Sequence, residues 1–196
     1  MNSVQCTDEG CNTWGKRKYN SSLSESYRSE GLAFSYRTEE WGKVVGHTSN
    51  DRVSIGDLVL KEQNFGEVDH VSWELTSSWF EGVLGLGLPS PSGRDRVSVI
   101  QNLFDQGLLD DPIFCLYLAE GNMTTDSELI LGGVDDALFT PPLITLQISD
   151  QAVRWESRLE KLQFGQDVFE PENELPIVFD SMSDIIWLPS NLQAYL

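Results

Sequence analysis

The sequence predicts a mainly β fold that contains one or two short helices. Short runs rich in Val, Ile, Leu, Tyr and Phe recur along the chain, and Gly, Asn and Asp interrupt them as they do at hairpin turns. Residues 97–106 show the helical spacing of apolar side chains instead. The chain has 196 residues, which is enough to bury a core in one domain, or in one domain and part of another.

Two segments predict antiparallel hairpins in the first half of the chain. They are GLAFSYRTEEWGKVVG at residues 31–46 and DRVSIGDLVLKEQNFGEV at residues 51–68. The predicted helix follows in VSVIQNLFDQG, where Ile100, Leu103 and Phe104 share one face and Gly107 is placed to cap the helix.

Strand character returns after the helix, so residues 12–145 are expected to be predominantly antiparallel β. The strand-like segments are FCLYL at 114–118, ELILGGVD at 128–135 and PLITLQI at 142–148. Residues 154–170 then lead into PIVFDSMSDIIWLP, residues 176–189, in which Asp180 emerges from an apolar run.

The charge balance excludes some classes of partner. Asp and Glu number 31 against 13 Lys and Arg, which gives a formal net charge of -18. Phosphate backbones and anionic lipids would be repelled, so neither nucleic acid nor a charged membrane surface is an expected partner. The balance fits either an ordinary solvated surface or service at low pH. No run reaches the roughly 20 apolar residues of a membrane span.

Several features favour a secretory protein. Cys6 and Cys11 are close enough to close a small loop, and Asn20 and Asn122 each begin a glycosylation sequon. The opening residues MNSVQCTDEG contain no apolar segment of a signal peptide. A chain with features of a secreted protein but no signal peptide leads to the expectation that the true N-terminus is missing.

In this order, the segments resemble the pepsin-like aspartic proteases. The matching stretches are the Cys6–Cys11 pair, YNSSLSESYR for the serine-rich turn, FSYRTEEWGKVVG for the flap hairpin, FEGVLGLGLP, FCLYL, LILGGVD, and VFDSMS for an active-site loop. The resemblance implies a pepsin-like acid protease fold. Residues 1–148 would be the remainder of the N-terminal lobe and residues 149–196 the beginning of the C-terminal lobe, with residues 144–148 in the sheet between the lobes.

The resemblance also implies the state of the cysteines and the role of one tyrosine. Cys6 and Cys11 would form a disulfide, and Cys115 would be a buried, reduced thiol. Tyr36 falls at the position of the flap tyrosine that closes over substrate, although a buried hairpin aromatic is an equally weighted alternative. Trp41 is expected to pack against the protein.

Peptide-bond hydrolysis in this family depends on two aspartates. Two carboxyl groups a few Å apart share one proton, so one can activate water while the other protonates the carbonyl oxygen. The resemblance makes Asp180 a catalytic aspartate, with Ser181 and Ser183 at matching positions, but Met182 replaces the loop glycine. That long side chain should push the two loops apart or force a backbone conformation that glycine alone adopts cheaply.

No second aspartate in a matching motif is visible. In the family the first loop precedes the segment to which residues 3–6 correspond, so the chain starts too late to include it. Asp8 lies inside the Cys6–Cys11 loop, lacks the apolar lead-in and is followed by Glu where a hydroxyl residue is needed, whereas Asp105 ends the predicted helix. Asp184 is expected to be an exposed loop acid. The chain alone is therefore predicted to be inactive.

No metal or cofactor is expected. His47 and His70 are isolated, accompany no ligand cluster and are predicted to lie at the surface.

Two functions remain open, a truncated aspartic endopeptidase and a non-catalytic homologue that binds peptides or proteins through the cleft. A purely structural acidic domain has only the charge in its favour. Both main readings imply peptide or protein ligands, a monomer, and a secreted or acidic secretory or vacuolar location.

Overall fold

The computed structural model describes residues 1–38, 42–88, 97–119, 126–149, 152–173, 175–183 and 185–189. They belong to two compact units. The first comprises Met1–Leu86 with Gly93–Asp135, and the second comprises Gly87–Ser92 with Asp136–Leu196. The strands confirm the predicted mainly β class, while the proposed lobe boundary at residue 148 stays a prediction.

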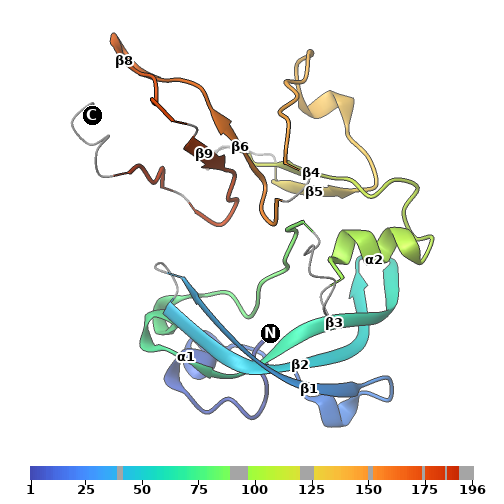
Figure 1. Ribbon diagram of the computed structural model, residues 1–196. Coiled ribbons are helices and arrows are strands. Elements are labelled where there is room, and N and C mark those ends of the chain that lie inside the picture. The colour runs from blue at the N-terminus through green and yellow to red at the C-terminus, as the bar shows by residue number, and fades with distance from the viewer. Residues whose placement is uncertain are drawn as a thin grey trace. The chain divides into compact units, whose positions relative to one another are not determined.

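A three-stranded antiparallel sheet forms the centre of the first unit (Figure 1). Its strands are β1 (Arg28–Thr38), β2 (Gly42–Ile55) and β3 (Leu58–Val71), in that order. Ile55 lies opposite Leu58, so a two-residue loop joins β2 to β3, and its Gly56 has a φ of 55°. Positive φ is what such a tight hairpin requires, and this hairpin confirms the prediction for residues 51–68.

Shorter elements surround the sheet. Before it come α1 (Glu9–Asn12), η1 (Thr13–Gly15) and η2 (Ser21–Leu23), and after it η3 (Trp73–Ser77), α2 (Val99–Asp105) and the antiparallel pair β4 (Phe114–Tyr117) and β5 (Glu128–Leu131). The predicted helix is confirmed as α2. Ser98 caps its start by accepting from the Gln101 N–H at 3.2 Å, and Gly107, with a φ of 67°, follows its last turn.

The apolar core of the first unit lies between α2 and the β2–β3 hairpin (Figure 1). Leu60, Val99 and Leu103 are buried there, and Val53, Ile55, Leu58, Leu108, Leu109 and Leu131 pack against them. Phe104, which was predicted to share the buried helix face, is 38% exposed. The helix therefore buries a narrower stripe than its apolar pattern indicated.

Two glycines let the sheet carry an aromatic side chain close to its backbone. A Cβ atom on Gly46 would lie 1.9 Å from the carbonyl oxygen of Glu67, and one on Gly66 would lie 2.7 Å from the Phe34 ring. Any larger residue at either position would have to displace backbone or ring atoms. The Phe34 ring thus covers a part of the sheet that has no side chains of its own.

The described residues of the second unit form two small antiparallel pairs. They are formed by β6 (Glu156–Leu159) with β9 (Leu175–Val178) and by β7 (Leu162–Phe164) with β8 (Asp167–Phe169), and η4 (Asp136–Leu138) precedes them. The strand expected at residues 144–148 is wrong, because the structure assigns none there. Ser157 Oγ of β6 donates to the Gln147 carbonyl at 2.9 Å, but such a side-chain bond does not make a backbone ladder.

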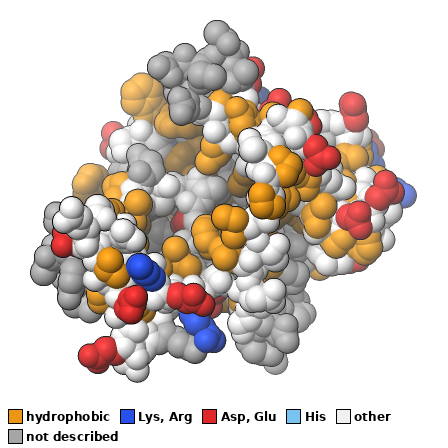
Figure 2. Space-filling view, turned by 90° about the horizontal axis from the view of Figure 1, so that it is seen from above, with side chains coloured by type: hydrophobic (Ala, Val, Ile, Leu, Met, Phe, Trp, Pro, Cys, Tyr) orange, Lys and Arg blue, Asp and Glu red, His pale blue; other side chains and the backbone are white. Residues whose placement is uncertain are grey.

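The surface view reflects the composition (Figure 2). Red carboxylate side chains are more frequent than blue Lys and Arg side chains on the face shown, and orange hydrophobic side chains are exposed among them. None of the described helices is long and apolar enough to cross a membrane.

A buried carboxylate attaches the chain before the sheet to β2. Asp51 is 3% exposed and accepts hydrogen bonds from the hydroxyls of Tyr19, Ser24 and Ser26 and from the Arg52 N–H. Burial alone would raise the pKa of Asp51, but these four donors outweigh it and lower the pKa to about 2. The pKa of Tyr19 is raised, first by burial and then by Asp51. Residues 19–26 therefore depend on an ionised Asp51.

We expect replacement of Asp51 by Asn to destabilise the protein by about 1–2 kcal/mol at neutral pH, because donors aimed at a carboxylate lose part of their partner. The folded pKa lies below the ordinary value, so this stabilisation is present above about pH 4 and is lost as the pH falls toward the folded value. Urea unfolding at several pH values measures the effect, and replacement of the exposed Asp110 by Asn is the control. A gap between Asp51→Asn and the wild type that stays constant down to about pH 2 would contradict the assignment.

Candidate active-site loop

Asp180 lies in the loop that follows β9, as the sequence indicated, and it is exposed. Its Oδ1 accepts a hydrogen bond from the Met182 N–H at 2.9 Å, and its carbonyl oxygen accepts from the Ser183 N–H at 3.4 Å. The loop thus turns tightly around its own aspartate. Such a turn gives the carboxylate a defined direction without a partner from another element.

Met182 does not adopt the glycine-like backbone conformation that was one of its two expected effects, and the displacement of an opposing loop stays a prediction. Among the described residues Trp14 is the non-glycine residue with positive φ, so Met182 has an ordinary backbone conformation. The bond to Asp180 uses the main-chain N–H, which methionine supplies as well as glycine does. The Met182 side chain is 43% exposed, so its obstruction of an opposing loop would be steric.

Ser183 connects the loop to the apolar residues after it. Its Oγ donates to the Ile185 carbonyl at 3.0 Å and accepts from Trp187 Nε1 at 3.1 Å. Ser181 is exposed. The two hydroxyl residues of the motif therefore have different roles in this chain, because Ser183 holds the local turn while Ser181 projects to solvent.

Tyr36 lies on β1 opposite Val44 of β2 and is 59% exposed. The alternative of a buried hairpin aromatic is therefore wrong. The loop end of this hairpin, where β2 starts, is held to the residue before η3, because the Lys43 N–H donates to Ser72 Oγ at 2.7 Å. Gly42 has a φ of 66°, and a Cβ atom there would lie 2.2 Å from Ser72 Oγ. Glycine is thus required where the hairpin meets η3.

The other aspartates considered in the sequence, Asp8 and Asp105, each accept a structural hydrogen bond. Asp8 accepts from the Val71 N–H at 2.8 Å, and Asp105 at the end of α2 accepts from Gln101 Nε2 at 2.8 Å. Trp41, Asn122 and Asp184 lie outside the described residues. Asn20 is described, and its Oδ1 accepts from the backbone N–H and the hydroxyl of Ser22 at the start of η2.

The 2 histidines differ in how far their side chains are exposed to solvent. His70 is 69% exposed, as predicted, and contacts Asp8 at 3.3 Å. The surface prediction is wrong for His47, whose side chain is 24% exposed because it lies between Glu67 and Asp69. Over the described part of the chain, no group of three or more His, Cys, Asp or Glu side chains is arranged to hold a metal ion.

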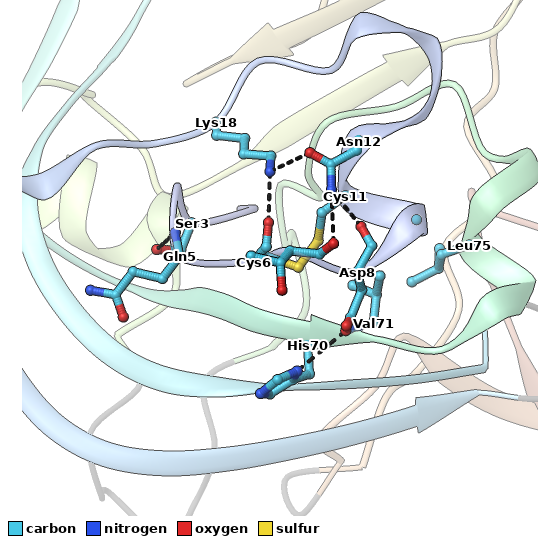
Figure 3. The surroundings of a disulfide bond; sticks show 12 residues. Ser3, Gln5, Cys6, Asp8, Cys11, Asn12, Lys18, His70, Val71 and Leu75 are labelled. Carbon is cyan, nitrogen blue, oxygen red and sulfur yellow. Dashed lines mark hydrogen bonds and ion pairs between the residues drawn. A yellow bond between two sulfur atoms is a disulfide. The ribbon is translucent and has the colours of Figure 1, made fainter.

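The cysteines form the predicted disulfide (Figure 3). Cys6 and Cys11 are bonded and completely buried, and Lys18 Nζ donates both to the Cys6 carbonyl at 2.6 Å and to Asn12 Oδ1 at 2.7 Å. Cys115 is free, as predicted, but it is half-buried on β4 where full burial was expected. The disulfide loop is therefore closed covalently and by a lysine that binds across it.

Comparison with known proteins identifies the family. The sequence model described as "Eukaryotic aspartyl protease" matches residues 1–195. The chain belongs to the eukaryotic aspartyl protease family. The Asp180 loop and the disulfide therefore belong to a chain whose family membership extends over nearly its whole length.

Similar aspartyl proteases include fungal and animal proteins. Vacuolar protease A of Aspergillus fumigatus is 36% identical over 177 residues, covering 89% of this chain and 44% of that protein. Cathepsin E of Cavia porcellus is 31% identical over 188 residues, covering 95% of this chain and 47% of that protein. Napsin-A of Mus musculus is 28% identical over 193 residues, covering 96% of this chain and 45% of that protein. The chain spans about half the length of the curated relatives it matches.

Sequence reasoning missed the buried polar side chains of the aspartyl protease sheet. Asp51, Ser49 and Glu67 are each at most 3% exposed. One signal was present, since Asp51 alternates with Val53 and Ile55 and so lies on the same strand face as these core residues. Alternation alone could not show which hydroxyls would satisfy the carboxylate.

We expect the Cys6–Cys11 bond to stabilise the fold by about 2 kcal/mol, since it closes a short loop in the unfolded chain. Replacement of both cysteines by Ser should lower the free energy of unfolding by this amount, whereas Cys115→Ser should leave it nearly unchanged. Mass mapping of a non-reduced digest tests the connectivity directly. A bridge that includes Cys115 would show that the assignment is wrong.

Proposed function

We propose that Asp180 is one catalytic aspartate of an aspartic endopeptidase site and that this chain alone does not hydrolyse peptide bonds. The observation that carries the proposal is the Asp180–Ser183 loop, in which the carboxylate is exposed and held by the Met182 N–H. Family membership supports peptide or protein substrates. It also supports acid-pH chemistry, because a shared proton on a carboxyl pair requires acidic conditions.

A single positioned carboxyl cannot perform both halves of the reaction. The sequence contains no Asp-Thr-Gly or Asp-Ser-Gly triplet that could provide the second aspartate. Losing one positioned acid or base typically costs on the order of 10²- to 10⁴-fold in rate. We propose accordingly that residues 1–148 and 149–196 are parts of two lobes, of which only the second contributes an aspartate from this chain.

Peptide binding without cleavage is a second candidate function. Two observations favour it: the exposure of Tyr36 on its anchored hairpin and the occupation of the loop glycine position by Met182. A binding role requires a surface that contacts peptide, and it does not require a second carboxyl group.

We further propose an acidic secretory or vacuolar location and a monomeric state. Names of relatives such as "Vacuolar protease A" support the location. An Asp51 that stays ionised to about pH 2 supports a fold that persists in acid. The disulfide and the sequon at Asn20 fit passage through an oxidising compartment, in which Asn20 and Asn122 would be glycosylated.

Cleavage of an unfolded protein at about pH 3–5, with and without a transition-state-mimicking aspartic protease inhibitor, tests the catalytic proposal. We expect no inhibitor-sensitive turnover from the unmodified chain. Addition of an upstream Asp-Thr-Gly segment should restore little activity unless Met182 is also changed to Gly, because the long side chain would obstruct the opposing loop. Asp180→Asn in the restored protein is the control and should abolish turnover. Inhibitor-sensitive cleavage by the unmodified chain would refute the proposal.

Binding of the same inhibitor, measured by calorimetry, tests the second function. We expect Tyr36→Ala to weaken binding by about tenfold and Tyr36→Phe to weaken it less, since the ring supplies most of the contact. Leu32→Ala is the matched control, because Leu32 lies on the same strand and is 48% exposed. Equal effects of the Tyr36 and Leu32 substitutions would exclude a specific role for the flap tyrosine.

A further inference from the structure

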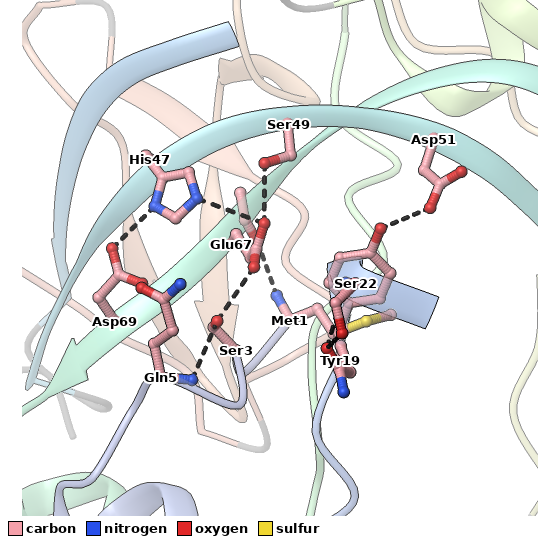
Figure 4. A network of polar contacts seen from close by, with 12 residues as sticks. Met1, Ser3, Gln5, Tyr19, Ser22, His47, Ser49, Asp51, Glu67 and Asp69 are labelled. Atoms are coloured by element: carbon pink, nitrogen blue, oxygen red, sulfur yellow. Dashed lines mark hydrogen bonds and ion pairs between the residues drawn. The ribbon is translucent and has the colours of Figure 1, made fainter. Parts of the chain in front are cut away.

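A buried carboxylate joins three parts of the first unit. Glu67 of β3 is 1% exposed and accepts hydrogen bonds from Ser3 Oγ at 3.0 Å and Ser49 Oγ at 2.9 Å (Figure 4). His47 Nε2 lies 3.3 Å from the same carboxylate. Burying a charge is costly unless it is paired and hydrogen-bonded, and these three partners meet that requirement.

His47 lies between two carboxylates. Its Nε2 faces Glu67 and its Nδ1 faces Asp69 at 2.8 Å (Figure 4). A neutral imidazole has one N–H and one lone pair, so it can donate to only one of them. Protonated His47 donates to both, and its geometry is therefore that of the cation.

The first residues of the chain are attached to β3 beside Glu67. The Ser3 N–H donates to the Val68 carbonyl at 2.9 Å, and the Val68 N–H donates to the Met1 carbonyl at 2.9 Å. The Gln5 N–H donates to Ser3 Oγ at 3.2 Å. Residues 1–5 thus lie along β3, and Ser3 is their side-chain connection to Glu67.

We propose that His47 and Glu67 form a proton-dependent latch that holds residues 1–5 against β3 in acid and weakens this attachment as the pH rises. When His47 loses its proton, one carboxylate faces a nitrogen lone pair and the cluster keeps two negative charges. Asp69 Oδ1 is already buried without a hydrogen-bond partner in the described structure, so Asp69 has little means of compensating. The latch requires neither peptide binding nor cleavage by the chain.

The direction of the pH effect follows from the surroundings of His47. Burial alone would lower the pKa of His47, but Asp69 and Glu67 outweigh burial and raise it. The stabilisation is therefore complete below the ordinary histidine pKa of about 6.5 and is lost as the pH rises through the folded value. Other ionisable groups facing Glu67 are the Met1 amino group, which donates to the Gly66 carbonyl at 3.0 Å, and the Tyr19 hydroxyl, which is bonded to Asp51.

Proton NMR titration tests the latch directly, because the chain has 2 histidines and His70→Gln assigns both signals. We expect His47 to titrate above the ordinary histidine pKa of about 6.5. Hydrogen exchange should show the protection of the Ser3 and Val68 amides falling about tenfold between about pH 5.5 and 8.5, after correction for intrinsic exchange, as one charge-assisted bond is lost.

Variants assign the titrating group. His47→Gln should abolish the pH dependence of protection, whereas His70→Gln should keep it. Glu67→Gln should lower the protection of Ser3 at both pH values, and acetylation of the Met1 amino group should keep the pH dependence. The latch is refuted if His47 titrates at or below the ordinary histidine value of about 6.5, if His47→Gln keeps the full pH dependence, or if acetylation removes it.

Discussion

The need to satisfy buried carboxylates controls how the first unit is put together. Asp51 on β2 and Glu67 on β3 are almost completely removed from solvent, and a charge in that position must find donors. Hydroxyls from residues outside the sheet supply them, Ser3 for Glu67 and Tyr19, Ser24 and Ser26 for Asp51. These hydrogen bonds attach the irregular segments before β1 to the sheet, beside the edge-on contact of the Tyr19 ring with Phe65.

These carboxylates also give the unit a particular response to pH. Asp51 keeps its charge to about pH 2 because its donors outweigh the effect of burial. His47 gains a proton more easily than an ordinary histidine because two carboxylates face it. Both effects favour the folded state in mildly acidic solution, which agrees with a chain of net charge -18 that carries few Lys and Arg.

At the candidate active site, the local conformation and the catalytic requirement can be separated. The loop around Asp180 forms with Met182 in place, because its key hydrogen bond uses a main-chain N–H and its backbone avoids positive φ. Catalysis by a carboxyl dyad depends in addition on how closely a second loop can approach. A side chain at position 182 is compatible with the first requirement, and its obstruction of the second is part of the proposed function.

Motif spacing in the sequence was enough to predict the mainly β class, the β2–β3 hairpin, helix α2, the disulfide and the position of Asp180 after a strand, because each depends on neighbouring residues. Tertiary structure decided the exposure of Tyr36, the ordinary backbone of Met182, the absence of a strand at residues 144–148 and the place of His47 between Glu67 and Asp69. The physical reason is that burial, strand pairing and hydrogen-bond partners involve residues far apart in the chain. Ser3 and Glu67, for example, are 64 positions apart, and no local pattern relates them.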